Sequence, residues 1–257
     1  MKTKKEIVED WLPRYTGCPL EEFGEYILLT NFSKYLDLFC EMEGVSVKSH
    51  EKAMPTATSG KITMINFGFG SPNAATIMDL LSAVKPKACL FLGKCGGLKK
   101  KNVLGDLILP IAAIRGEGTS DDYFAERVPA LPAFNLQKVV STTIIEHQRN
   151  YYTGTVFTTN RRVWEYDDEF KSYLAQTRAM AIDMETATIF TVGFANKIPT
   201  GALLLVSDQP MVASGVKTAI SDQFVTEQFV LEHLKIGIET LKHLVAMGLT
   251  VKHLRFD

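Results

Sequence analysis

The sequence has little of what marks a disulfide-stabilised or a nucleic-acid-binding protein. Its 257 residues include four cysteines without CxxC spacing, and a chain of this length can stabilise itself without disulfides. Lys and Arg number 28 against 29 Asp and Glu, so the net charge of -1 leaves no basic excess to neutralise a nucleic-acid backbone. We therefore expect reduced cysteines in a cytoplasmic protein and no nucleic-acid partner.

The sequence also lacks a segment typical of export or of a membrane span. Its basic N-terminus is followed at once by Glu6, Glu9 and Asp10, where a signal peptide would need an apolar stretch. The longest uncharged run, 62–78, contains glycine, proline and asparagine, as a strand, a turn and a helix start would. No repeat or flexible linker is visible, so we expect a single domain over 1–257 and no membrane partner.

What is present is an alternation of short apolar segments with helical patterns. Strands are predicted at 26–29, 62–69, 88–92, 107–114, 155–159 and 202–206. Helices are predicted at 72–84 with Ser71 as N-cap, at 183–195, and at about 221–247. Most of the strands are continuously apolar, which indicates an α/β layered domain with a mixed or parallel sheet. In such sheets ligands bind beyond the carboxyl ends of the strands.

Two glycine-rich turns follow predicted strands, but neither matches a nucleotide-binding fingerprint. In the first, Asn73 stands where the third glycine of GxGxxG belongs. The second, 93–97, is followed by Leu98 and Lys99 and so lacks the Lys-Ser/Thr ending of a P-loop. The glycines serve either tight turns or close approach of a ligand to the backbone.

Carboxylates at two predicted element ends are candidates for acid–base chemistry. Asp208 ends the most apolar strand, where desolvation would raise its pKa and let it act as a general acid, although the pattern alone favours a cap of the following turn. Asp183 and Glu185 open a predicted helix, where they either favour the helix dipole or grip two ribose hydroxyls. Phe157 is either core or a platform for a flat base. The five histidines show no metal-ligand spacing, so no metal is expected.

Eight segments in a fixed order are more specific than any single motif. They are 14–32, 65–81, 91–98, 105–115, 153–165, 181–190, 203–210 and 215–217. In this order they resemble the nucleoside phosphorylase and nucleosidase superfamily, and within it the catalytic domain of the AMP nucleosidase family. The resemblance implies a three-layer α/β domain with a mixed, barrel-like central sheet flanked by helices. It also implies a homo-oligomer, with a hexamer as the usual assembly, and no cofactor.

The resemblance further implies a role for each candidate residue. Asp208 would protonate the purine at N7, Glu185 would hold the 2′- and 3′-hydroxyls of the ribose beside Met184, and Phe157 would stack on the base. Anionic Glu185 would also favour the positive charge that develops on the sugar as the N-glycosidic bond breaks. The other substrate-binding positions expected around them are Thr158, Asp183, Ser207, Gly93, Lys94 and Gly96.

The departures from the superfamily pattern indicate the nucleophile. Phosphorylases that resemble this chain hold inorganic phosphate with an Arg and a Ser or Thr, where this sequence has Phe91 and Lys94, and the phosphate turn after the first strand is replaced by 30–32. Water is therefore the expected nucleophile, and the implied reaction is hydrolysis of AMP to adenine and ribose 5-phosphate. The alternatives are a phosphate-dependent purine nucleoside phosphorylase and a catalytically silent nucleotide-binding sensor. With the motifs beginning by Arg14, a separate regulatory domain is not expected.

A nucleotide substrate also requires groups that hold its 5′-phosphate. Fixed cations or aligned backbone donors supply this binding, and they must lie on the loops at the site. The basic candidates are Arg161, Arg162, Lys217 and Arg115, with Thr119, Ser120 or a residue from a neighbouring subunit as helpers. Each basic residue could alternatively be an exposed surface charge.

Overall fold

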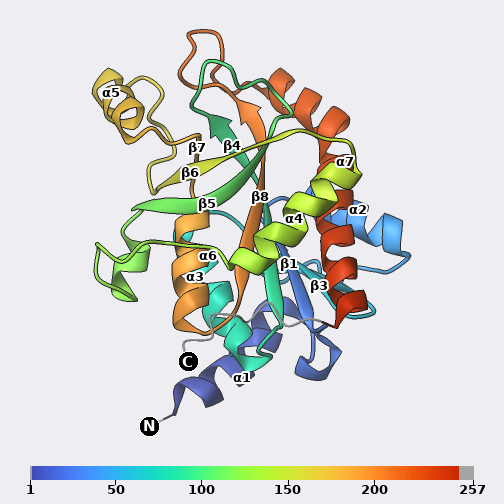
Figure 1. Cartoon of the computed structure of the whole chain (residues 1–257). Helices are drawn as coiled ribbons and strands as arrows, with labels where there is room; N and C mark the ends of the chain where they lie inside the picture. The colour runs from blue at the N-terminus through green and yellow to red at the C-terminus, as the bar shows by residue number, and fades with distance from the viewer. Residues whose placement is uncertain (1, 249–257) are drawn as a thin grey trace.

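The computed structural model of the protein describes residues 2–248 and has a mixed sheet at its centre (Figure 1). Its strands are β1 (Tyr26–Thr30), β2 (Thr56–Ser59), β3 (Ile62–Asn66), β4 (Ala88–Gly97), β5 (Leu107–Gly116), β6 (Tyr151–Thr159), β7 (Ala181–Asp183) and β8 (Thr200–Asp208). The strand order is β2-β3-β1-β4-β7-β6-β5-β8, and β4 also pairs with β8. Five strands therefore close into a barrel, and β1, β3 and β2 extend the sheet from β4. The predicted mixed, barrel-like sheet is confirmed.

Both parallel and antiparallel pairs build this sheet. β1 is parallel to β3 and β4, β4 is parallel to β8, and β6 is parallel to β5 and β7. The antiparallel pairs are β2–β3, β4–β7 and β5–β8. In Figure 1, β5 and β6 run across the direction of β8. This crossing lets the ends of several strands meet at one end of the barrel.

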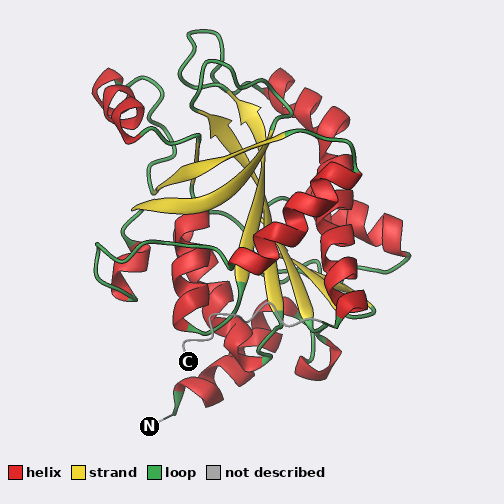
Figure 2. Ribbon diagram, viewed as in Figure 1, coloured by secondary structure: helices red, strands yellow, loops and turns green. Residues whose placement is uncertain are grey.

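Helices cover the sheet on both sides (Figure 2). They are α1 (Lys4–Thr16), α2 (Ser33–Glu43), α3 (Ser71–Leu80), α4 (Phe134–Glu146), α5 (Asp168–Thr177), α6 (Thr186–Ala195) and α7 (Ala219–Met247), with short 3-10 turns at Leu20–Glu22, Leu81–Ala83 and Thr119–Asp122. Successive residues of β1 face opposite sides: Ile27 packs in the core beneath α1, α3 and α6, and Leu28 in the core beneath α2, α4 and α7. Burial on both faces explains why the strands read as continuously apolar.

The predicted elements are found, with two differences at helix starts. All six predicted strands exist, whereas the short β2 and β7 were not predicted. Gly70, at φ 86°, is the N-cap of α3, and the Ser71 hydroxyl donates instead to the Met184 carbonyl at 2.6 Å. Helix α6 begins at Thr186, because Asp183 ends strand β7 in register with Thr158. Within residues 2–248, we find no helix with the length and apolar character that crossing a bilayer requires.

Candidate active site

A cavity opens where the ends of five strands meet. Asn31 and Phe32 follow β1, and Lys94, Cys95 and Gly96 end β4. The other lining residues are Phe69, Thr159, Arg161, Arg162, Trp164, Glu165, Ile182, Asp183, Met184, Glu185, Ser207, Asp208 and Lys217. Most of the residues predicted from the strand ends and from the family resemblance therefore line one cavity beyond the ends of the strands.

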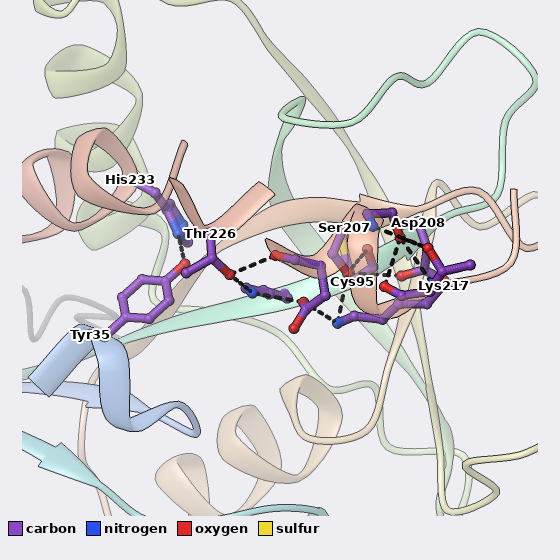
Figure 3. A network of polar contacts seen from close by, with 11 residues as sticks. Tyr35, Cys95, Ser207, Asp208, Lys217, Thr226 and His233 are labelled. Carbon is purple, nitrogen blue, oxygen red and sulfur yellow. Dashed lines mark hydrogen bonds and ion pairs between the residues drawn. The ribbon is translucent and has the colours of Figure 1, made fainter. Parts of the chain in front are cut away.

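Asp208 ends β8 at the cavity wall, beside Ser207 and Lys217 (Figure 3). The Ser207 hydroxyl donates to Asp208 Oδ1 at 2.8 Å and fixes the carboxyl group. Burial raises the pKa of Asp208, and it outweighs the opposing hydrogen bond from Ser207 and the nearby charges of Lys217 and Arg162. The carboxyl group therefore keeps its proton to higher pH than an ordinary aspartate does, which is the direction that a general acid requires.

Glu185 lies in the loop between β7 and α6 and is only 2% exposed. Its Oε1 accepts a hydrogen bond from the Gly70 amide at 2.8 Å, and its Oε2 accepts one from the Met184 amide at 3.3 Å. Burial and then the charge of Asp183 raise the pKa of Glu185, against the hydrogen bonds of these amides and of Asn31. The carboxyl group is held rigidly, yet its ionised form is poorly solvated until a ligand donates to it.

Asp183 supports this loop from behind. One carboxylate oxygen accepts from Thr158 Oγ1 at 2.7 Å, and the other accepts from the amide of Thr186 at 2.8 Å and from its hydroxyl. Thr158 is fully buried, and its hydroxyl oxygen also accepts from the Ala187 amide at 2.9 Å. Thr158, expected to bind substrate, therefore lies behind the cavity wall and positions Asp183.

The aromatic side chains at the cavity differ from the expected one. Phe157 is 3% exposed and packs edge-on against Phe170 and Tyr173 of helix α5, with ring centroids 6.0 and 5.9 Å apart, and it is not among the residues that line the cavity. Gly93 also lies outside the lining, and a Cβ atom at this position would lie 2.5 Å from the ring of Phe91. The aromatic residues that do line the cavity are Phe32, Phe69 and Trp164.

The four basic candidates separate into two groups. Arg161, Arg162 and Lys217 line the cavity, where Arg161 pairs with Asp167 at 2.7 Å and Arg162 with Glu165 at 3.1 Å. Arg115 lies outside it, because its guanidinium donates to Ser120 and Asp121 side chains and to the carbonyls of Ala125, Val128 and Phe124. Ser120 is buried in the same turn, and Thr119 begins it. These three residues organise a loop away from the cavity.

Several lining residues were not predicted. Asn31 and Phe32 follow β1 directly, so the strand-end rule applied to that strand would have found them. Phe69, half exposed between two glycines, stands out as an aromatic residue in a turn. Trp164 and Glu165 lie in the loop after β6, and no local sequence pattern indicates that this loop returns to the cavity. Among residues 2–248, no three His, Cys, Asp or Glu side chains gather as a metal site would need.

The comparisons with known proteins agree with this fold. Residues 25–246 match the model of the Phosphorylase superfamily. The crystal structure of AMP nucleosidase from Bacteroides thetaiotaomicron is 55% identical, with a TM-score of 0.86, and the match covers 96% of this chain and 99% of that one. A uridine phosphorylase structure from Vibrio fischeri, 22% identical with a TM-score of 0.79, covers 90% of this chain and 96% of its own and shows the shared fold.

A second AMP nucleosidase matches this chain at lower sequence identity. AMP nucleosidase of Escherichia coli K12 is 30% identical over 92% of this chain, which spans 58% of that relative's length. The family resemblance carried by the eight sequence segments is thereby confirmed.

Proposed function

The chain belongs to the phosphorylase superfamily, and from that premise we propose that it hydrolyses the N-glycosidic bond of AMP to adenine and ribose 5-phosphate. One observation carries the proposal: a single cavity holds Asp208 and Glu185, both with raised pKa, together with cationic Arg161, Arg162 and Lys217. The choice of AMP as the proposed substrate rests on the similarity to proteins named AMP nucleosidase.

Each residue has its own part in the proposed reaction. Asp208 donates its proton to purine N7 while the C1′–N9 bond breaks, and the electron pair of that bond moves to the base. Hydrogen bonds donated by the ribose hydroxyls favour the ionised form of Glu185, whose negative charge then stabilises the oxocarbenium-like sugar. Water then adds its oxygen to C1′ and releases a proton to the solvent, from which the Asp208 carboxylate is protonated again. Met184, Ser207, Lys94 and Gly96 complete the substrate contacts, and no metal or cofactor takes part.

The surroundings of Phe91 favour water over phosphate as the nucleophile. Phe91 is fully buried, and its ring centroid lies 5.7 Å from that of Phe67 in the core. This position therefore offers no cation to a phosphate ion.

An assay of adenine release with and without phosphate tests the proposed reaction. We expect AMP to yield adenine and ribose 5-phosphate at the same rate in both conditions, because water needs no phosphate. The products can be identified by chromatography. Formation of ribose 1,5-bisphosphate, or strict dependence on phosphate, would make the protein a purine nucleoside phosphorylase. Tight AMP binding without turnover would make it a silent sensor.

The three basic residues at the cavity provide a second test. Because a charged hydrogen bond to phosphate is worth ~1.5–3 kcal/mol, we expect alanine at the residue that binds the 5′-phosphate to lower kcat/KM for AMP by roughly 10- to 100-fold. The same change should leave kcat/KM for adenosine nearly constant, since adenosine lacks the phosphate. The measurement compares both substrates on Arg161→Ala, Arg162→Ala and Lys217→Ala.

Arg127→Ala serves as the matched control, because Arg127 is exposed and lies outside the cavity. Equal cleavage of adenosine and AMP by the wild type, or an unchanged AMP preference in all three variants, would contradict the phosphate assignment. The protein would then be a general purine nucleosidase.

Exposed apolar side chains and free cysteines bear on the assembly and the location of the protein. Large apolar side chains are exposed, with Phe134 at 75% and Ile220 at 83%, as the surface of a subunit in a homo-oligomer would be. We propose a homo-oligomer, with a hexamer as the first assembly to test. The four cysteines are free thiols, which fits a reducing cytoplasm. We also propose that residues 2–248 form one catalytic domain.

A further inference from the structure

Two lysines at the cavity converge on one carboxylate from helix α7. Lys94 Nζ and Lys217 Nζ each lie 2.9 Å from Asp222 Oδ1, and Lys94 also donates to Thr226 Oγ1 at 2.8 Å. The Lys94 side chain is only 5% exposed and Lys217 21%, whereas Asp222 is 41% exposed. A buried ammonium group needs such a partner, and Asp222 supplies it to both lysines at once.

The carboxylate is held in place by the start of α7. Thr218 caps the helix by accepting from the Ser221 amide at 3.1 Å, and the Ser221 hydroxyl accepts from the Thr218 amide at 2.9 Å. The Thr226 hydroxyl donates to the Asp222 carbonyl at 2.7 Å. Asp222 therefore stands in the first, rigid turn of the helix. Partial burial opposes its ionisation, but hydrogen bonds from Lys217 and Lys94 hold its pKa below the ordinary value.

This cluster is continuous with the catalytic carboxyl group. Lys217 Nζ lies 3.5 Å from Ser207 Oγ, which donates to Asp208. Figure 3 shows Thr226 at one side of this network and Ser207, Asp208 and Lys217 at the other. Lys94 and Lys217 both line the cavity that holds Glu185, whereas Asp222 approaches them from outside its lining. An anion that entered the cavity would compete with Asp222 for the same two ammonium groups.

Two lysines with one carboxylate carry a net charge of +1, and without the carboxylate they would carry +2. A pair of unopposed ammonium groups in a partly desolvated cavity is a good site for a phosphate dianion. With Asp222 in place, a phosphate oxygen would instead meet a carboxylate of like charge. The Asp222 carboxylate thus pairs, from outside the cavity lining, with the two ammonium groups that an oxyanion in the cavity would need.

We infer that Asp222 is a specificity-determining residue: it is a built-in anion that keeps inorganic phosphate from binding between Lys94 and Lys217. The inference rests on the proposed function, because phosphate exclusion leaves water as the nucleophile. Phosphorolysis would form a bond from a phosphate oxygen to C1′ as the C1′–N9 bond breaks, with the electron pair and a proton going to the base.

The experiment removes the charge of Asp222 and measures phosphate binding directly. Asp222→Asn and Asp222→Ser should bind inorganic phosphate at least about tenfold more tightly than the wild type in titration calorimetry, because like-charge repulsion is removed. In the presence of AMP, phosphate should then inhibit adenine release or appear in ribose 1,5-bisphosphate, detected by phosphorus NMR. Asp222→Glu keeps the charge and is the matched control, so it should bind phosphate as weakly as the wild type.

The outcomes separate the two sources of a phosphate group. An unchanged phosphate affinity in Asp222→Asn and Asp222→Ser overturns the inference, and a change confined to KM for AMP would assign the lysines to the substrate's 5′-phosphate instead. Tighter phosphate binding by Asp222→Glu would also overturn it, since charge would not be the cause. If the wild type releases no adenine from AMP, the proposed function fails, but the calorimetric comparison still decides the role of Asp222.

Discussion

Asp208→Asn is expected to lower kcat for AMP hydrolysis by about 10²- to 10⁴-fold, because a positioned general acid contributes a factor of this size. The amide has nearly the same shape as the carboxyl group and can still accept the hydrogen bond that Ser207 Oγ donates at 2.8 Å. It cannot supply a proton to purine N7 as the base departs. Nucleotide binding should therefore change much less than kcat, which steady-state kinetics together with calorimetry of AMP binding would measure.

The pH profile provides an independent readout of the same role. Because burial raises the pKa of Asp208, the acid form persists to higher pH than for an ordinary aspartate. The wild-type rate should fall as the pH rises through this raised pKa, and Asp208→Asn should lose that limb of the profile. Asp106→Asn is the matched control, since Asp106 accepts from the Val103 amide at 2.8 Å outside the cavity. Near-normal turnover by folded Asp208→Asn protein would refute the assignment.

The parts of this site that follow from strand ends could be predicted from the sequence. Asp208 and Lys94 lie at or near the ends of long apolar strands, and the run of apolar residues in each strand is visible in the local sequence. The rule that ligands bind beyond strand ends then places them in one site. The barrel closure through β4 and β8 was not evident from periodicity and entered through the family resemblance alone.

The parts that depend on packing between distant segments could not be predicted in this way. Phe157 lies close to the end of β6, where the sequence alone suggests a place in the cavity wall. Whether its ring lines the cavity depends on α5, whose Phe170 and Tyr173 pack against it. Arg115 follows the same strand-end logic, yet its donors are all used by carbonyls and side chains of the 120–128 turn. Asp222 joins the lysines from a helix that begins after Asp208, and only the folded chain brings these charges together.

Glu185→Gln is expected to impair catalysis and stabilise the fold at the same time. Loss of the negative charge beside the ribose should lower kcat/KM for AMP by roughly 10²- to 10³-fold, as removal of one preorganised electrostatic contact does. The Gln side chain keeps an oxygen that can accept from the Gly70 amide, so the loop should retain its conformation. Kinetic assays and thermal unfolding of the same preparation would measure both effects.

The stability gain follows from the raised pKa of Glu185. Between the ordinary pKa of an unfolded glutamate and the raised value in the fold, the folded protein binds more protons, so wild-type stability falls as the pH rises through this range. Gln does not titrate, so the variant lacks this pH-dependent loss of stability, which arises from burial and from the charge of Asp183. At neutral pH the variant should be more stable by on the order of 1–2 kcal/mol, which corresponds to a Tm higher by roughly 2–8 °C, and this difference should vanish below about pH 4.

Glu117→Gln is the matched control, because Glu117 is buried outside the cavity and accepts from Ser120 and Thr188. An active Glu185→Gln enzyme would remove Glu185 from the mechanism, whereas an inactive variant less stable than the wild type at neutral pH would show that its carboxylate serves the fold as well as the substrate.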